Sequence, residues 1–224
     1  MTEWDQAGFA VMPLVFGVAE IELLQRAVAE SPVMRSRAGA RHLLAEPAVA
    51  RIARDPQLAS LASEALGNEA MPFRATLFDK SRGANWLVVW HQDTALPLRA
   101  RRDVPGWGPW STKAGVLYAH APAEVLSGLI ALRIHLDDSG ADNGPLRVLP
   151  GTHRMGVLTD AQVQDLAQHL SPVDCLVPRG GVLAMRPLLL HSSSKITATL
   201  PRRVIHIEYA VSQDLGDGLE LATA

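Results

Sequence analysis

The stretch Asn85-Trp-Leu-Val-Val-Trp-His-Gln-Asp93 joins a strand-like run of β-branched and aromatic residues to a His-X-Asp pair. Along a strand, residues i and i+2 point to the same side, so His91 and Asp93 can direct both side chains toward one point. A third partner must come from a distant segment. His191 is the candidate, because it ends an apolar run, residues 182–190, that we expect to form a buried strand.

These three residues have the composition of a transition-metal site. Two histidines and one carboxylate, with the remaining metal positions open, are typical of mononuclear non-haem iron(II) oxygenases. The His-X-Asp pair alone is weak evidence, since His91 also fits a hydrogen-bonded core histidine and Asp93 a turn residue before Pro97. The other histidines lack a carboxylate at ligand spacing and are expected to be structural: His120, His135, His169 and His206.

The bulk composition is that of one globular domain. With 224 residues, 48% hydrophobic and 20% charged, the chain can bury a sizeable core, and we expect a single domain over residues 1–224. A formal net charge of −2 offers no general attraction to nucleic acid or to an anionic membrane. The single cysteine, Cys175, and an N-terminus unlike a signal peptide predict a cytoplasmic protein without a membrane span.

Helical periodicity dominates the first third of the chain, and strand-like alternation follows it. Ile21, Leu24 and Val28 lie at helical spacing within residues 18–30, and a second helical stretch, 48–66, is broken by Asp55-Pro56. Strand-like segments lie at 73–80, 85–91, 128–136, 146–149, 182–191 and 203–211. We therefore predict a mainly β fold, in which flanking helices pack on one side of an antiparallel β core.

Residues 96–123 have the character of a long irregular insertion rich in proline and glycine. Structured loops of this length are uncommon unless they are functional, so we predict a lid or substrate loop here. Its candidate substrate contacts are Trp107, Trp110, Tyr118 and Arg99. In the alternative interpretation, the tryptophans attach the loop to the core and the arginines are solvated.

Three motifs in the right order resemble the phytanoyl-CoA dioxygenase family of iron(II)- and 2-oxoglutarate-dependent oxygenases. They are residues 85–93, the stretch Asp142-Asn-Gly-Pro-Leu-Arg-Val-Leu-Pro-Gly-Thr-His153, and His191 followed by Arg202-Arg-Val-Ile-His-Ile-Glu-Tyr209. The resemblance implies a double-stranded β-helix core (jelly-roll, cupin-like). It also implies iron(II) held by His91, Asp93 and His191, with 2-oxoglutarate and O2 as co-substrates.

The resemblance also implies a residue that binds 2-oxoglutarate. In the family an arginine follows the distal histidine by eleven residues, and here that residue is Arg202. The strand 202–209 alternates a polar face, which includes Arg202, with an apolar face, and the polar face suits a cavity. A guanidinium there would hold the distal carboxylate in a bidentate pair. The alternative is that Arg202 is solvated and that Arg203 binds instead.

Four further residues are candidates for the co-substrate site. Ser193 matches a position where the family often offers a hydroxyl group, and Lys80 and Thr76 share one face of a preceding strand. Arg133 lies inside an apolar strand, where a charge without a partner would be costly to bury. Contact with 2-oxoglutarate or substrate would compensate for that cost, and so would a salt bridge.

The expected reaction is hydroxylation, or a related oxidation, of an unactivated C–H bond in a small metabolite such as an intermediate of secondary metabolism, with release of succinate and CO2. Asp93 favours this outcome over halogenation, because halogenating relatives carry a small residue at that position. Two other classes stay open: a cupin-like metalloenzyme that does not use 2-oxoglutarate, and a non-catalytic ligand-binding jelly roll. We expect a monomer or a homodimer that binds a small molecule.

Overall fold

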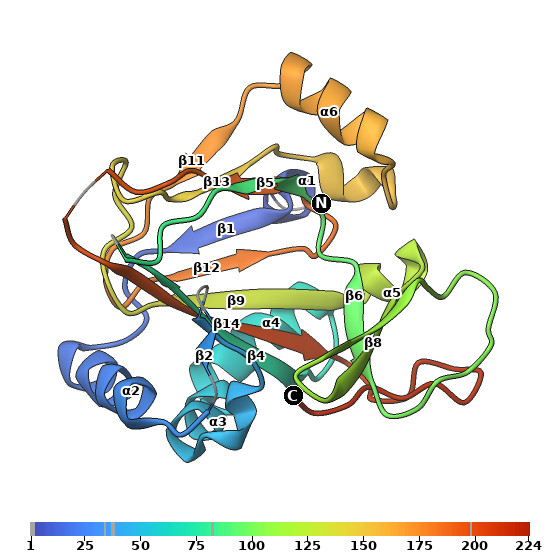
Figure 1. Ribbon diagram of the computed structural model, residues 1–224, viewed down its shortest axis with the longest axis horizontal. Coiled ribbons are helices and arrows are strands. Elements are labelled where there is room, and N and C mark those ends of the chain that lie inside the picture. The colour runs from blue at the N-terminus through green and yellow to red at the C-terminus, as the bar shows by residue number, and fades with distance from the viewer. Residues whose placement is uncertain (1–2, 34, 37–38, 82, 198) are drawn as a thin grey trace.

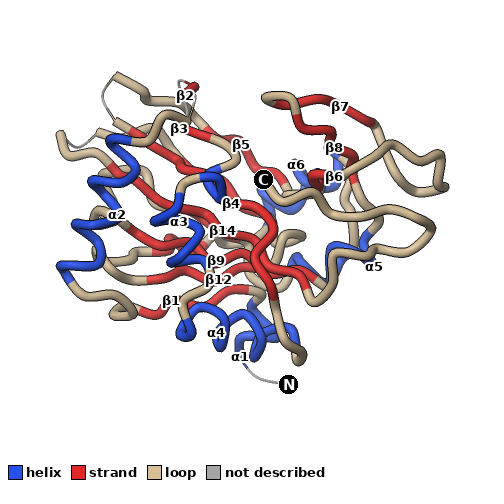
Figure 2. Tube along the Cα trace, turned by 90° about the horizontal axis from the view of Figure 1, so that it is seen from below, coloured by secondary structure: helices blue, strands red, loops and turns tan. Residues whose placement is uncertain are grey.

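The computed structural model describes residues 3–33, 35–36, 39–81, 83–197 and 199–224 (Figure 1). Two antiparallel sheets form the core, a third and smaller sheet stands at one end, and helices cover one face of the largest sheet (Figures 1 and 2). The predicted mainly β fold with flanking helices is confirmed. Within these ranges, no helix is long and apolar enough to cross a membrane.

The sheets are assembled from segments far apart in the sequence. The seven-stranded sheet has the order β1-β12-β9-β14-β4-β3-β2, and its strands are β1 (Phe9–Met12), β2 (Arg35–Ser36), β3 (Gly39–Ala40), β4 (Met71–Lys80), β9 (Leu129–His135), β12 (Val182–Met185) and β14 (Arg202–Ala210). The four-stranded sheet has the order β11-β10-β13-β5, with β5 (Val88–His91), β10 (Leu146–Val148), β11 (Val173–Cys175) and β13 (His191–Ser193). The three-stranded sheet, β6-β8-β7, contains β6 (Ala95–Leu98), β7 (Trp110–Lys113) and β8 (Val116–His120).

The helices are short and are concentrated before β4. They are α1 (Glu3–Ala7), α2 (Val18–Glu30), the 3-10 turn η1 (Leu43–Ala45), α3 (Pro47–Ala53), α4 (Pro56–Leu66), α5 (Ala123–Ser127), the 3-10 turn η2 (Thr152–Met155) and α6 (Asp160–His169). The predicted break at Asp55-Pro56 separates α3 from α4, because the Asp55 carboxylate caps α4 by accepting a 2.8 Å hydrogen bond from the Gln57 amide. Gly67 ends α4 in the left-handed conformation, with a φ of 70°.

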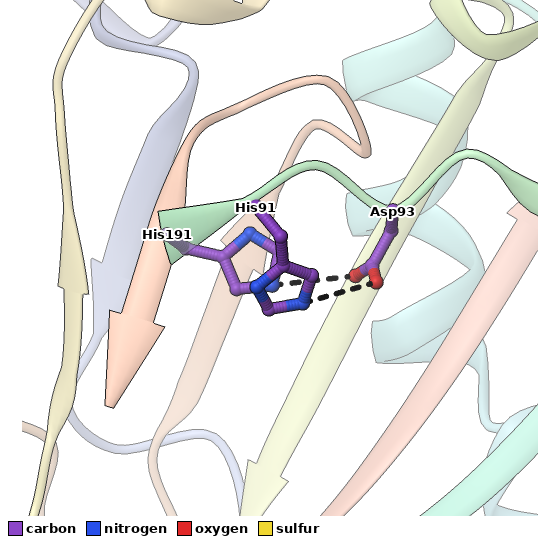
Figure 3. Close-up of side chains that lie close together, drawn as sticks. All are labelled: His91, Asp93 and His191. Atoms are coloured by element: carbon purple, nitrogen blue, oxygen red, sulfur yellow. Dashed lines mark ion pairs between the residues drawn. The ribbon is translucent and has the colours of Figure 1, made fainter. Parts of the chain in front are cut away.

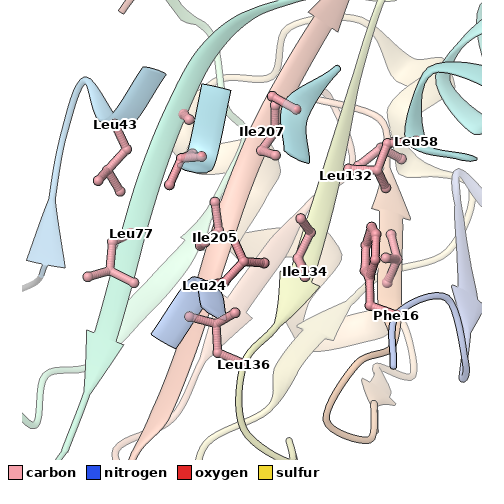
Figure 4. Packing of buried hydrophobic residues seen from close by; sticks show 14 of the residues in the cluster. Phe16, Leu24, Leu43, Leu58, Leu77, Leu132, Ile134, Leu136, Ile205 and Ile207 are labelled. Atoms are coloured by element: carbon pink, nitrogen blue, oxygen red, sulfur yellow. The ribbon is translucent and has the colours of Figure 1, made fainter. Parts of the chain in front are cut away.

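The main apolar core lies between these helices and the outer face of the seven-stranded sheet (Figure 4). The predicted helical face of α2 is confirmed, since Ile21, Leu24 and Val28 are at most 2% exposed. Leu58 of α4 and Ile205 of β14 are fully buried in the same cluster. Burial of side chains of this size contributes about 1.5–3 kcal/mol each. The core therefore fixes the sheet that carries the polar site on its opposite face.

That opposite face of the sheet is polar near its centre. The register pairs Arg202 of β14 with Lys80 of β4, and Arg133 lies on the adjacent strand β9. This face looks toward the four-stranded sheet, because the three cations line one cavity with His91 of β5 and His191 of β13. The alternation expected from the sequence of β14 thus gives one apolar face under the helices and one polar face inside the fold.

Two predicted elements differ from the structure. The apolar run 182–191 is not one strand: β12 belongs to the seven-stranded sheet, a turn follows, and His191 begins β13 in the four-stranded sheet. Arg186 and Pro187 interrupt the run where β12 ends, and a proline inside such a run argues against one continuous strand. Residues 96–123 are only partly irregular, since they contain most of β6 and all of β7 and β8. Pro97 is tolerated in β6 because β6 is an edge strand of its sheet.

Candidate metal centre and active site

His91 and His191 lie directly opposite each other in the antiparallel pair β5–β13. Their ring centroids are 4.2 Å apart, and Asp93 follows β5 with its carboxylate turned toward both rings (Figure 3). The Asp93 amide donates a 2.9 Å hydrogen bond to the Pro187 carbonyl, which fixes the segment after the strand. One donor atom from each of the three side chains lies within 4.8 Å of the other two. The fold therefore brings the three predicted ligands to one point.

The hydrogen bonds of the two imidazoles leave one nitrogen of each ring free for a metal. His91 Nδ1 lies 2.8 Å from the Val89 carbonyl, and His191 Nδ1 lies 2.9 Å from the Leu189 carbonyl. Since a carbonyl oxygen only accepts, each Nδ1 carries the hydrogen, and each Nε2 keeps its lone pair. The Nε2 atoms face the two oxygens of Asp93, at 3.7 Å for His91 and 3.5 Å for His191.

Electrostatics favours the protonation states that a metal requires. Burial alone would raise the pKa of the Asp93 carboxyl, but the charges of His191, His91, His206 and Arg74 hold that pKa well below its usual range. Burial lowers the pKa of His191 to about 4, although Asp93 opposes the shift. A carboxylate beside the neutral imidazole of His191 is a form that binds a divalent metal.

Gln92 points away from the centre and anchors the segment that carries two of the ligands. Its side-chain amide donates to the carbonyls of Leu188 at 2.7 Å and Gly156 at 2.9 Å, while its oxygen accepts from the Leu158 amide at 2.8 Å. No sequence pattern marks this role, because the three partners are far from Gln92 along the chain. Gln92 therefore helps to fix the backbone between His91 and Asp93.

A cavity of about 70 Å³, which we call the inner cavity, lies beside the three candidate ligands. Besides these ligands it is lined by Phe78, Lys80, Trp86, Val88, Arg133, Leu146, Ser193 and Arg202. Lys80 is fully buried and donates to Ser193 Oγ at 2.8 Å and to the Ser194 carbonyl at 2.7 Å. Arg202 donates to the same hydroxyl at 3.3 Å, and that hydroxyl in turn donates to the Gly144 carbonyl at 2.8 Å.

The inner cavity holds three buried cations, and Asp93, a candidate metal ligand, is the only carboxylate among the described residues of its lining. Among the described residues, no carboxylate lies within salt-bridge distance of Lys80, Arg133 or Arg202, and Arg202 Nε and Nη1 have no hydrogen-bond partner. Burial and then the charges of Arg202 and Arg133 lower the pKa of Lys80 to about 7. Burial lowers the pKa of Arg133 and Arg202 as well. Such a cluster is costly unless an anion enters it.

The structure distinguishes between the two neighbouring arginines of β14. Arg202 is 3% exposed and lines the inner cavity. Arg203 points elsewhere and forms a two-pronged pair with Asp137, at 2.8 Å through Nε and 2.7 Å through Nη2. Arg133 forms no salt bridge with Asp137 or Glu208, the two carboxylates that the sequence offered as partners; it lies 2.9 Å from His206 Nδ1 and stacks on Phe78.

A second cavity, which we call the outer cavity, lies on the other side of Asp93 and measures about 320 Å³. His91 and Asp93 belong to its lining, and its other polar residues include Arg41, Arg74, Thr76, Lys113, His120 and His206. Thr76, predicted for the co-substrate site, therefore lies here and not in the inner cavity. His206 and His120 line the outer cavity, although their spacing in the sequence indicated a structural role. Two histidines this far apart in the chain form no local pattern that would show that they lie close together.

None of the four predicted substrate contacts lines the inner or the outer cavity. Arg99 is exposed and pairs with Glu220 at 2.7 Å, while Trp107 and Trp110 pack against apolar clusters of the three-stranded sheet and its neighbours. Tyr118 is 1% exposed, and its hydroxyl lies 3.2 Å from His42 Nε2. The tryptophans thus attach this region to the core, as the alternative interpretation had it.

Known proteins support the fold and the family. A curated relative, L-proline trans-4-hydroxylase from Streptomyces griseoviridis, is 28% identical over 188 residues, which cover 71% of this chain and 62% of that protein; the chain thus spans less than two thirds of its relative's length. The iron-bound structure of EctD from S. alaskensis has a TM-score of 0.69 at 20% identity and covers 92% of this chain and 74% of its own. The epimerase SnoN in complex with Fe3+, alpha ketoglutarate and nogalamycin RO has a TM-score of 0.70 at 19% identity, with coverages of 99% and 92%.

The structural likenesses confirm the double-stranded β-helix (jelly-roll) core, which the seven-stranded and four-stranded sheets form. Residues 4–204 match the family described as phytanoyl-CoA dioxygenase (PhyH), which is most of the chain. The match spans the three candidate ligands and the cations of the inner cavity. The chain belongs to the phytanoyl-CoA dioxygenase family of iron(II)- and 2-oxoglutarate-dependent oxygenases.

Proposed function

We propose that this protein is an iron(II)- and 2-oxoglutarate-dependent dioxygenase that oxidises an unactivated C–H bond of a small metabolite, with release of succinate and CO2. His91, Asp93 and His191 would hold the iron. Their fit is supported by the convergence of the three donor atoms and by the two backbone carbonyls that keep both Nε2 atoms unprotonated. When bound, iron(II) together with 2-oxoglutarate supplies the activation of O2 for such an oxidation.

The observation that carries this proposal is the uncompensated positive charge of the inner cavity. Three buried cations beside the candidate ligands match the two negative charges of 2-oxoglutarate better than they match water or a neutral molecule. Arg202 is the residue proposed for the distal carboxylate, since two of its nitrogens have no partner and its planar group suits a bidentate pair.

The other residues of the inner cavity have supporting roles in this proposal. Lys80 and Ser193 would orient the same carboxylate, because the Ser193 hydroxyl already links Lys80 to Arg202. Arg133 would add charge from the neighbouring strand. The apolar lining, Phe78 and Trp86 among it, would exclude water from the co-substrate.

The outer cavity is the proposed place for the molecule that is oxidised. It borders His91 and Asp93 from the side that the inner cavity leaves free, so a substrate there would lie next to the iron without displacing 2-oxoglutarate. Two relatives named above are associated with small molecules. One is a hydroxylase of L-proline, and the structure of the other contains nogalamycin RO. We propose hydroxylation as the outcome, with other oxidations as variants of the same chemistry.

An anaerobic titration with iron(II) and then 2-oxoglutarate tests this function. The expected result is a weak visible charge-transfer band that needs both components, and formation of succinate once air is admitted. Arg202→Met should weaken 2-oxoglutarate binding by roughly 10-fold or more, since charge-assisted hydrogen bonds are lost. Arg203→Met is the matched control, because Arg203 is paired with Asp137 outside the cavity.

Each alternative class predicts a different result in that experiment. A metalloenzyme that does not use 2-oxoglutarate would bind iron but show no band, and Arg202→Met would behave like Arg203→Met. A non-catalytic jelly roll would bind neither component. Either result would refute the proposed function.

A further inference from the structure

The outer cavity continues into a third hollow near the surface, which we call the rim hollow. The rim hollow measures about 620 Å³, and the outer cavity about 320 Å³. Arg41 and Lys113 line both of them. Arg41 follows β3 and Lys113 ends β7, so the hollow lies where the β2–β3 hairpin and the three-stranded sheet face each other (Figure 2). A molecule that reaches the candidate iron site from this direction passes both cations.

Neither cation is neutralised by a residue in the described part of the chain. Among the residues that the structure describes, Arg41 and Lys113 have no carboxylate within salt-bridge distance, whereas Arg74 in the same outer cavity is paired with Glu208 and donates to the Ala95 carbonyl at 2.8 Å. Among the described residues that line the two hollows, Asp93 is the only carboxylate, and it is a ligand of the proposed iron site. Two positive charges are thus left over at this entrance.

Lys113 and Arg74 both lie against one aromatic ring, although their charges repel each other. Lys113 Nζ lies 5.0 Å from the ring centroid of Tyr118, and the Arg74 guanidinium carbon lies 5.6 Å from the same centroid. His42 stacks on Tyr118 as well, with ring centroids 6.3 Å apart. Burial lowers the pKa of Lys113 and of His42, and the charges of Arg41 and Arg74 lower both further. The buried Tyr118 ring therefore contacts both the paired Arg74 and Lys113, which has no carboxylate partner among the described residues.

The backbone supports the same conclusion. Three non-glycine residues of the described chain have positive φ angles, and two of them, His42 at 62° and Ala114 at 48°, line the rim hollow. Such conformations cost free energy and are concentrated at binding sites. They place Arg41 and Lys113, the neighbours of these two residues in the sequence, on opposite sides of one hollow.

We propose that Arg41 and Lys113 bind an anionic group of the substrate, a carboxylate or a phosphate, and that this contact directs the rest of the molecule toward His91 and Asp93. This inference rests on the proposed function, and it names the chemical class of the molecule that is oxidised. The anionic group lies at the rim, away from the reacting carbon. The co-substrate does not need these cations, because the inner cavity has three of its own.

A labelling experiment tests the anion site without a known substrate and without iron. Pyridoxal 5'-phosphate forms an imine with a lysine amine, with loss of water, and borohydride reduces the imine to a stable amine that peptide mapping locates. The chain has three lysines: Lys80 is buried, Lys195 is exposed, and Lys113 lies at the proposed site. We expect pyridoxal phosphate to label Lys113 over Lys195 by about fivefold or more, and pyridoxal without phosphate to show no such preference.

Two variants and a protection experiment test whether the labelling depends on the proposed anion site. Arg41→Gln should abolish the preference for Lys113, while Arg99→Gln, an exposed arginine paired with Glu220, should leave it intact. Protection by inorganic phosphate but not by acetate identifies a phosphate site, and protection by acetate identifies a carboxylate site. Equal labelling by both reagents, or an unchanged preference in Arg41→Gln, overturns the proposal.

Kinetics with matched pairs of compounds connects the site to turnover. Substrate-dependent succinate release is measured for acids or phosphate esters and for their amides or neutral alcohols. Only the anionic member of a pair should be turned over, and Arg41→Gln or Lys113→Met should raise its KM about 10-fold or more with kcat retained. The Arg99→Gln control should keep both the KM of wild type and its slow consumption of 2-oxoglutarate without substrate. If the wild-type protein does not consume 2-oxoglutarate, the proposed function is refuted. If it does, but turns over the neutral amide or alcohol of a pair faster than the anionic compound, only the present inference is refuted.

Discussion

The imidazole rings of His91 and His191 face each other across β5 and β13, and each ring is oriented by the carbonyl of the residue two positions before it. The two histidines thus reach the same arrangement from two strands that lie 100 residues apart in the chain. Because both Nδ1 atoms are occupied by backbone, the orientation of the rings does not depend on a bound metal. The site is therefore arranged before iron enters, which lowers the entropic cost of binding.

Removal of the Asp93 carboxylate should eliminate iron binding. Asp93→Ala deletes the group that both Nε2 atoms face and leaves two neutral imidazoles without a charge to balance the metal. We expect iron(II) affinity to fall well beyond the roughly 10-fold that loss of an outer partner costs. Calorimetry under anaerobic conditions measures it, and Asp174→Ala, at an exposed pair with Arg147, is the control. Equal affinities of the two variants would refute the assignment of the ligand.

The affinity for 2-oxoglutarate should depend on pH through Lys80. With a pKa lowered to about 7 in the empty site, Lys80 is protonated below that pH and increasingly neutral above it. The dianion binds the protonated form, so the affinity is highest below about pH 7 and falls by up to about tenfold per pH unit above it. Lys80→Arg keeps its charge and should flatten the curve over roughly pH 7–9. A wild-type curve as flat as that of the variant would contradict this prediction.

Gly144 should tolerate no side chain, for a reason that involves the same lysine. Its φ is 67°, and a Cβ would lie 2.4 Å from the Ser194 carbonyl oxygen, the atom that accepts the hydrogen bond from Lys80. Gly144→Ala should therefore weaken 2-oxoglutarate binding and lower the free energy of unfolding. Gly67→Ala, with a φ of 70° and nothing within 4 Å, should cost only backbone strain of about 1 kcal/mol. Urea denaturation of both variants compares them, and equal losses would count against this packing.

The hydroxyl of Tyr209 should stabilise the fold without affecting the site. Tyr209 is fully buried on the apolar face of β14 and donates a 2.9 Å hydrogen bond to the Ala53 carbonyl at the end of α3. Tyr209→Phe should lower the free energy of unfolding by about 1–2 kcal/mol, because a buried carbonyl loses its donor. Iron and 2-oxoglutarate affinities should remain those of wild type. A variant as stable as wild type in urea would mean that this bond contributes nothing.

Much of the fold follows from local sequence. The helix at 18–30 and the break at Asp55-Pro56 could be predicted, because helical spacing, caps and proline act within a few residues. The two faces of β14 could be predicted for the same reason, since alternation is a property of neighbours along one strand. The prediction of one strand over 182–191 was wrong even though Arg186-Pro187 marks a break there, because the apolar segments on both sides dominated the pattern.

The same distinction between local and long-range features applies to the candidate site. The sequence by itself determined the three ligand types, the strand that carries Arg202 and the family to which the chain belongs. Only the tertiary structure decided that Arg203 pairs with Asp137, that Thr76 lies in the outer cavity, and that Arg41 and Lys113 share one hollow. The reason is physical: spacing along a chain reports on neighbours in one element, whereas the meeting of distant charges depends on the register and packing of whole sheets.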